Sequence, residues 1–119
     1  MYAAADERLL PHDFAPGPRD IIVGKRGKRV TEHPGNTWFH DEVIQAELDN
    51  YSASDKKHEK SQVILRVLET VRNEGGSFVK LNKPAGRYFV IEDAAAKATI
   101  GQGFRDVLLG HYKSSKEFK

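Results

Sequence analysis

The chain has 119 residues, of which 39% are hydrophobic and 30% charged, and its formal net charge at pH 7 is +2. This composition suits one domain with a core beneath a well-solvated surface. The absence of cysteine excludes a disulfide framework, a thiolate metal site and a cysteine nucleophile. The longest apolar runs fall far short of the roughly 20 residues that span a bilayer, and the start of the chain lacks the pattern of a signal peptide. We therefore expect a nuclear protein, with the cytoplasm as the alternative.

The first half of the chain predicts a tail, a strand, a loop and a helix. Residues 1–18 are rich in proline without a hydrophobic period, which indicates a flexible tail. A β-branched run predicts a strand over 21–23, and the polar, glycine-rich residues 24–29 predict a loop. The turn sequence His33-Pro34-Gly35-Asn36 leads into a helix over about 37–51, with the asparagine as its N-cap.

The second half predicts two further helices around a β-hairpin. Apolar residues at helical spacing predict a second helix over about 56–74, which the glycine pair at 75–76 ends. Two runs of strand-forming residues, 78–81 and 88–91, flank a turn and predict the hairpin. A third helix begins at Asp93, which can cap it.

The order of these elements predicts an α+β fold. We expect a single domain over 19–112, in which three helices pack on a small antiparallel sheet with a hairpin, in a winged-helix-like arrangement. Residues 113–119 are expected to form a C-terminal tail. Whether the strand at 21–23 joins the hairpin stays open.

Two glycines interrupt the third predicted helix. Gly101 and Gly103 each cost about 1 kcal/mol relative to alanine in a helix. The triplet that contains them lacks the strand and the further glycine of a dinucleotide-binding fingerprint. We therefore expect close helix packing at these positions rather than a ligand contact.

The charged residues are sorted along the chain. Residues 30–55 contain six acidic residues and no Lys or Arg, a net charge of −6. Net charges of +4, +3 and +3 occur over 19–29, 56–72 and 77–91. A nearly neutral protein sorted in this way can present one strongly positive face.

The three basic segments suit a phosphate backbone. A glycine-flanked loop lets backbone N–H groups approach phosphate oxygens, and the start of a helix attracts anions. We therefore predict a nucleic-acid-binding module of a transcription regulator, with duplex DNA favoured over RNA. The loop would hold phosphates, the second helix would dock on a groove and the hairpin would act as a wing. The predicted contact residues are Lys25, Arg26, Gly27, Lys28, Arg29, His33, Asn36, Lys56, Lys57, Lys60, Lys80, Lys83 and Arg87.

Three aromatic residues near the basic loops offer stacking with bases. They are Trp38, Tyr88 and Phe89. Strand alternation places Tyr88 and Phe89 on opposite faces, so one of the two is expected in the core. Trp38 is expected to pack rather than to bind.

Other interpretations are open. Clustered Lys and Arg are often only a solvated surface. A protein–protein or self-association module is the main alternative function, because an acidic helix and basic faces can pair between copies. No enzymatic activity, metal or cofactor is expected, since the five histidines lack zinc-site spacing and no nucleophile accompanies His33 or His40.

Several short blocks of the sequence stand at a characteristic spacing: Asp20 to Gly27, His33 to Asn36 with Phe39, Lys60-Ser61, Gly75 to Phe78, and Gly86 to Val90. Together they resemble an uncharacterised domain family that is abundant in diatoms and related algae. The match extends over about 19–108, and the chain departs from it at Lys25, Ser77 and Tyr88-Phe89. The resemblance implies the domain boundaries and no activity. Positions that fit it and can meet a ligand are Lys25, Arg26, Gly27, His33, Asn36 and Lys60.

Overall fold

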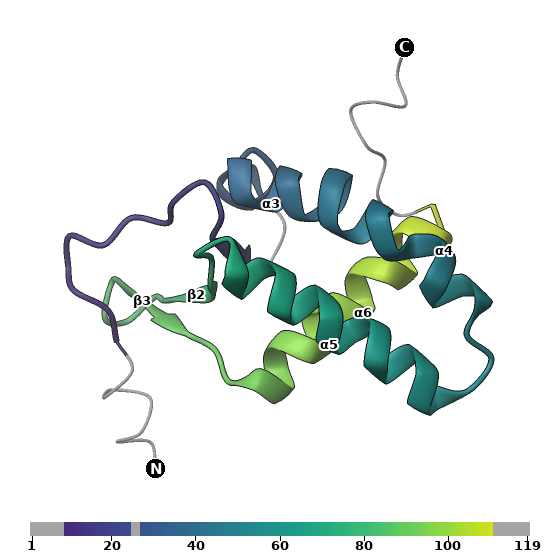
Figure 1. The fold of residues 1–119 in the computed structure, drawn as a ribbon. Helices are drawn as coiled ribbons and strands as arrows, with labels where there is room; N and C mark the ends of the chain where they lie inside the picture. The colour runs from purple at the N-terminus through teal and green to yellow at the C-terminus, as the bar shows by residue number, and fades with distance from the viewer. Residues whose placement is uncertain (1–8, 25–26, 111–119) are drawn as a thin grey trace.

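A three-stranded sheet combines one parallel and one antiparallel pair of strands. The computed structural model describes residues 9–24 and 27–110. The strands are β1 (Ile21–Val23), β2 (Phe78–Asn82) and β3 (Arg87–Val90), in the order β1-β2-β3 (Figure 1). β1 runs parallel to β2, and β2 pairs with β3 as the predicted antiparallel hairpin.

The connection between β1 and β2 explains why the prediction of a wholly antiparallel sheet is wrong. The chain leaves the end of β1, passes through several helices and returns to start β2 beside the start of β1. A long helical crossover of this kind joins parallel strands. The α+β class is confirmed and β1 is the third strand, whereas the winged-helix-like arrangement is not confirmed.

Four helical segments are described instead of the three predicted. The additional one is the short α2 (Lys28–Thr31), which lies where the sequence predicts a loop. The first predicted helix is a continuous segment of α3 (Pro34–Trp38), the π-helical η1 (Phe39–Ile44) and α4 (Gln45–Ala53). The second and third are α5 (Lys57–Asn73) and α6 (Asp93–Leu108). None of the helices in the described part of the chain is long and apolar enough to cross a membrane.

Both faces of the sheet are packed. On one face, Ile21 of β1 and Phe78 of β2 join a large cluster with buried residues of η1, α5 and α6. On the other face, Ile22 and Val79 join a smaller cluster with Val30 of α2. Because successive side chains of a strand point to opposite faces, these short apolar runs serve both clusters.

Residues 9–14 lie against the hairpin, within the segment for which a flexible tail is predicted. Leu9 forms an isolated bridge with Phe89, and the Leu10 amide donates to the Tyr88 carbonyl oxygen over 2.8 Å. The Phe14 ring packs edge-to-face on Tyr88, with a centroid distance of 6.0 Å. This segment therefore covers part of the smaller cluster.

Close helix packing explains one of the two glycines of α6, Gly103, as predicted. A Cβ atom at Gly103 would lie 3.3 Å from the Phe39 ring, and one at Gly101 would lie 3.5 Å from Ile64. Both glycines are buried. Gly103 thus lets α6 approach η1 closely, and this gain in packing offsets its poor helix propensity. The distance at Gly101 is an ordinary contact, so packing on α5 does not require glycine there.

Candidate nucleic-acid interface

The H-P-G-N turn fastens α3 to the edge strand β1. His33 Nε2 donates to the Asp20 carbonyl oxygen at 2.9 Å. A Cβ atom at Gly35 would lie only 1.8 Å from that same oxygen, so only glycine fits there. Pro34 occupies the first helical position, where its missing N–H has no cost. The turn is therefore a packing device between helix and strand.

Asn36 completes this attachment with its side-chain amide. Its Oδ1 accepts from the Ile22 amide at 2.9 Å, and its Nδ2 donates to the Ile22 carbonyl oxygen at 3.0 Å. On the open edge of β1, the side chain thus makes the two backbone hydrogen bonds that a neighbouring strand would otherwise make. Asn36 is 6% exposed and lies within α3, whose N-cap is His33. The predicted role of Asn36 as N-cap is wrong, because His33 is the N-cap. The role of Asn36 as a nucleic-acid contact stays a prediction, for a side chain that is buried and bonded to Ile22.

Asp20 and the glycine pair connect β1 to the start of β2. The Asp20 carboxylate accepts from the Gly17 amide at 2.7 Å and from the Ser77 amide at 3.0 Å. A Cβ atom at Gly76 would lie 2.0 Å from the Arg19 carbonyl oxygen. The sequence blocks around Asp20, at His33 to Asn36 and at Gly75-Gly76 therefore all serve to join β1, β2 and α3.

Two of the three basic segments leave the sheet at the same end. β1 and β2 are parallel, so the residues after β1 and the hairpin turn after β2 project from the same end. Gly27, Lys28 and Arg29, which follow β1, are exposed, and Val30 beside them packs on Ile22 and Val79. Lys25 and Arg26 lie outside the described residues. We call Lys28, Arg29, Lys80, Lys83 and Arg87 the hairpin-end cluster.

The hairpin contributes its cations from fixed positions. Lys80 pairs with Val23 on one side and with Phe89 on the other, and its side chain is exposed. Arg87 pairs with Asn82, and its Nε donates to the Leu10 carbonyl oxygen at 2.8 Å. Lys83 is exposed in the turn. No acidic residue occurs over 21–31 or 77–91, so the cations of this end are not neutralised from within their own segments.

The third basic segment lies at the opposite end of the molecule (Figure 1). α5 has 17 residues and is therefore about 25 Å long, and its last turn, not its first, precedes β2. Lys56 and Lys57 are exposed at its start. Lys60 is engaged locally, since its Nζ donates to the Tyr51 carbonyl oxygen at 2.9 Å and lies 4.4 Å above the Tyr51 ring. The three predicted segments do not form one face.

The remaining arginines of this segment are held in ion pairs. Arg66 Nη2 lies 3.0 Å from Glu47 Oε1, and this hydrogen bond lowers the pKa of the Glu47 carboxyl below its ordinary value. Arg72 pairs with Asp93 and lowers the pKa of that carboxyl in the same way. These pairs join α4 to α5 and α5 to α6. Local sequence patterns do not reveal these pairs, because the partners are 19 and 21 residues apart in the chain.

The aromatic residues are divided between the core and the hairpin end. The Arg19 guanidinium lies 4.7 Å above the Trp38 ring, so Trp38 is a packing residue as predicted. Tyr88 packs on Phe14 in the smaller cluster. Phe89 is half-buried on the opposite face of β3, beside Lys80.

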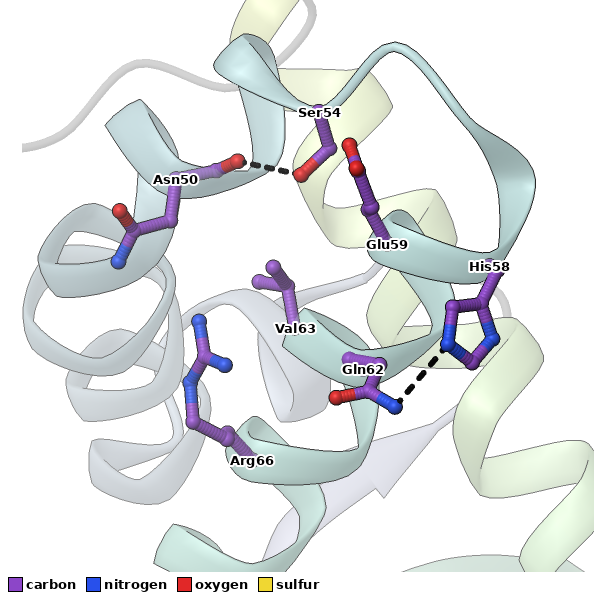
Figure 2. Close-up of a pocket in the computed structure, with 7 residues that line it drawn as sticks. All are labelled: Asn50, Ser54, His58, Glu59, Gln62, Val63 and Arg66. Atoms are coloured by element: carbon purple, nitrogen blue, oxygen red, sulfur yellow. Dashed lines mark hydrogen bonds between the residues drawn. The ribbon is translucent and has the colours of Figure 1, made fainter.

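A shallow polar groove between α4 and α5 is a second candidate site, which sequence reasoning missed. It has a volume of about 400 Å³. Figure 2 shows that Ser54 donates to the Asn50 carbonyl oxygen and that Gln62 approaches His58, at distances of 2.8 and 3.4 Å. Arg66 at its floor is paired with Glu47. The polar groups of the groove mostly bond one another, and none forms a nucleophile–base pair, so we place the candidate interface at the hairpin end.

The chain belongs to the family described as "Domain of unknown function (DUF6824)", whose model matches residues 20–106. This confirms the resemblance to an uncharacterised domain family, and the matched range contains the junction of β1, β2 and α3. No curated protein and no solved structure matches the chain.

Proposed function

We propose that this member of the DUF6824 family binds nucleic acid through its hairpin-end cluster. One observation carries the proposal: the parallel pairing of β1 and β2 brings two basic, acid-free segments to the same end of the sheet. Cations gathered in this way bind phosphates and release condensed counterions, which supplies most of the affinity of non-specific binding. A role in transcription regulation in the nucleus remains part of the proposal. The phosphate contacts suit the duplex DNA favoured from the sequence, and they suit a single strand equally.

The positions of α5 and the hairpin do not suit the predicted mode of binding, in which a helix docks on a groove beside a wing. A basic recognition helix flanked by a wing requires both elements on one face, and the start of α5 lies at the far end from the hairpin. Backbone contacts from the loop after β1 and from the hairpin turn are the alternative that this fold supports. Phosphate contacts position a nucleic acid without reading its sequence.

The test compares two charge-matched double variants. Lys80→Ala with Lys83→Ala removes two cations from the hairpin end, and Lys56→Ala with Lys57→Ala removes two from the start of α5. Fluorescence anisotropy with labelled oligonucleotides at several salt concentrations measures affinity and its salt dependence. We expect the first pair to weaken binding by about tenfold at low salt and to reduce the log–log salt slope by about 2.

The second pair is the control, and we expect it to leave the slope nearly unchanged. If both double variants lost affinity equally, binding would depend on net charge and not on the hairpin end. An absence of binding by the wild-type chain at low salt, where electrostatic attraction is strongest, would contradict the proposal.

Self-association is the second candidate, because acidic and basic surfaces lie on different elements. Asp49 on α4 and Asp55 after it are exposed, whereas the exposed cations of the hairpin end lie after β1, within β2 and in the hairpin turn. Such surfaces can pair head to tail between copies. Light scattering of the wild-type chain would then show a dimer that dissociates as salt is added.

A further inference from the structure

We infer that the hairpin end binds single-stranded nucleic acid, with a base stacked on Phe89 beside Lys80 and Arg87. This inference rests on the proposed function and names the class of nucleic acid that the site takes.

The strand register places an aromatic ring among cations on one face of the sheet. Lys80 is opposite Phe89 in the β2–β3 pair, and Asn82 is opposite Arg87. Side chains two residues apart on a strand share a face, so Lys80, Arg87 and Phe89 point to the same side. Neighbouring strands are about 4.8 Å apart, and residues two apart on one strand about 7 Å, so both cations lie within reach of a nucleotide on the ring.

Phe89 differs from its neighbours in the way it packs. Tyr88 and Val90 join the smaller cluster on the other face, and Ile91 joins the larger one. Phe89 is half-buried and belongs to neither cluster. The pair of Lys80 and Phe89 lies two residues nearer to the hairpin turn than Phe78 and Ile91. Phe78 and Ile91 are covered by the helices.

An aromatic ring on a sheet surface with flanking cations suits unpaired bases. Every base has a π-face that can stack on an aromatic side chain, while cations hold the backbone phosphates. In a duplex the base faces are already stacked on one another. Phe89 would therefore add affinity for a single strand and none for a duplex.

The first experiment uses the full chain and three labelled probes: a 12-nucleotide oligo-dT, a 12-base-pair duplex, and poly-glutamate of similar charge. Phe89→Leu keeps an apolar side chain and removes the aromatic face, and Tyr88→Leu is the control on the opposite face of β3. Wild-type protein is expected to bind oligo-dT more tightly than the duplex. Phe89→Leu should lower the affinity for oligo-dT by about 5- to 30-fold and leave duplex affinity unchanged, whereas Tyr88→Leu should leave both unchanged.

A second variant gives a readout that does not depend on the stability of Phe89→Leu. Phe89→Trp in a Trp38→Phe background carries its only tryptophan at the site. Stacking of a base should quench its fluorescence on addition of oligo-dT and not on addition of duplex. Trp38→Phe alone provides the blank.

The outcomes separate the two claims. No binding of any oligonucleotide would overturn the proposed function and this inference together. Binding that is weakened by Lys80→Ala with Lys83→Ala but not by Phe89→Leu, with no quenching of the new tryptophan, would overturn the inference alone. Equally tight binding of poly-glutamate would assign the site to acidic polymers in general and would also overturn it.

Discussion

Asn36 directs both polar atoms of its side chain to the backbone of β1, and Gly35 beside it allows α3 to come within contact distance of Asp20. Both residues belong to the block that makes the sequence most recognisable. The hydrogen bonds of Asn36 and the small size of Gly35 hold α3 against the edge strand β1. A residue type common at binding sites is here buried for a structural reason.

The structural role of Asn36 predicts that its replacement lowers stability and leaves nucleic-acid affinity unchanged. Asn36→Ala leaves the buried N–H and C=O groups of Ile22 without partners, and each such loss costs about 1–3 kcal/mol. We expect the free energy of unfolding to fall by about 2–4 kcal/mol in urea titrations. The protein that remains folded should bind nucleic acid as the wild type does.

Asn73→Ala is a suitable control, because Asn73 is exposed at the end of α5 and its replacement should change stability by less than about 0.5 kcal/mol. If folded Asn36→Ala bound nucleic acid more weakly but unfolded at the same urea concentration as the wild type, Asn36 would be a binding residue and not a structural one.

The turn His33 to Asn36 was predictable from the sequence, but the partner of Asn36 was not. Asparagine before a helix is a common cap, and local rules therefore favour that role. The observed hydrogen bonds reach 14 residues back to β1. No local pattern contains that information.

Among the elements, α5 and the hairpin agree well with expectation. The predicted helix at about 56–74 is observed as Lys57–Asn73, because a long amphipathic stripe and a glycine stop are strong signals. The short α2 and the parallel pairing of β1 were missed. One turn of helix has no measurable period, and the choice of pairing depends on where the crossover returns the chain.

The η1 segment shows how an irregular helix alters a predicted face. The sequence aligns Phe39, Val43 and Ala46 as one apolar line and Ile44, Leu48 and Tyr51 as the neighbouring one. Ala46 is exposed, whereas the other five are buried or pack against the large cluster. A π-helical stretch holds more residues per turn than an α-helix, which shifts the positions after it. After η1 the buried face therefore follows the second line, through Leu48 and Tyr51, and leaves Ala46 outside.

The ion pair between Glu47 and Arg66 gives the α4–α5 contact a pH dependence. Because the pKa of Glu47 is lowered in the folded state, the pair stabilises the fold above the ordinary value of 4.5, and this contribution is lost as pH falls through the folded pKa. We expect Glu47→Gln to lower the melting temperature slightly near neutral pH. The difference from wild type should shrink as the pH falls below 4.5 and through the lowered pKa of Glu47.

The control for this effect is Glu69→Gln, at an exposed position of α5. Its melting temperature should follow that of the wild type across the same range. A difference for Glu47→Gln that persists undiminished at low pH would show that the pair acts through packing and not through charge.

At the scale of the whole molecule, charge is divided between two ends of a body that measures 41 × 35 × 24 Å. The sequence correctly locates the basic segments along the chain. Their grouping in space depends on the parallel sheet and on the length of α5, which segment counts cannot show. The hairpin-end cluster therefore replaces the single positive face that the charge pattern predicts.

The most direct test of this account is a titration of uniformly ¹⁵N-labelled wild-type protein with a 12-nucleotide single strand, followed by two-dimensional NMR. If the hairpin end binds the single strand, the amide signals of its residues shift together with one affinity: Lys28, Arg29, Lys80, Lys83, Arg87 and Phe89. The signals of Lys56 and Lys57 at the start of α5 should stay in place. Shifts confined to α5 or to the groove between α4 and α5, or no shifts at low salt, would contradict it.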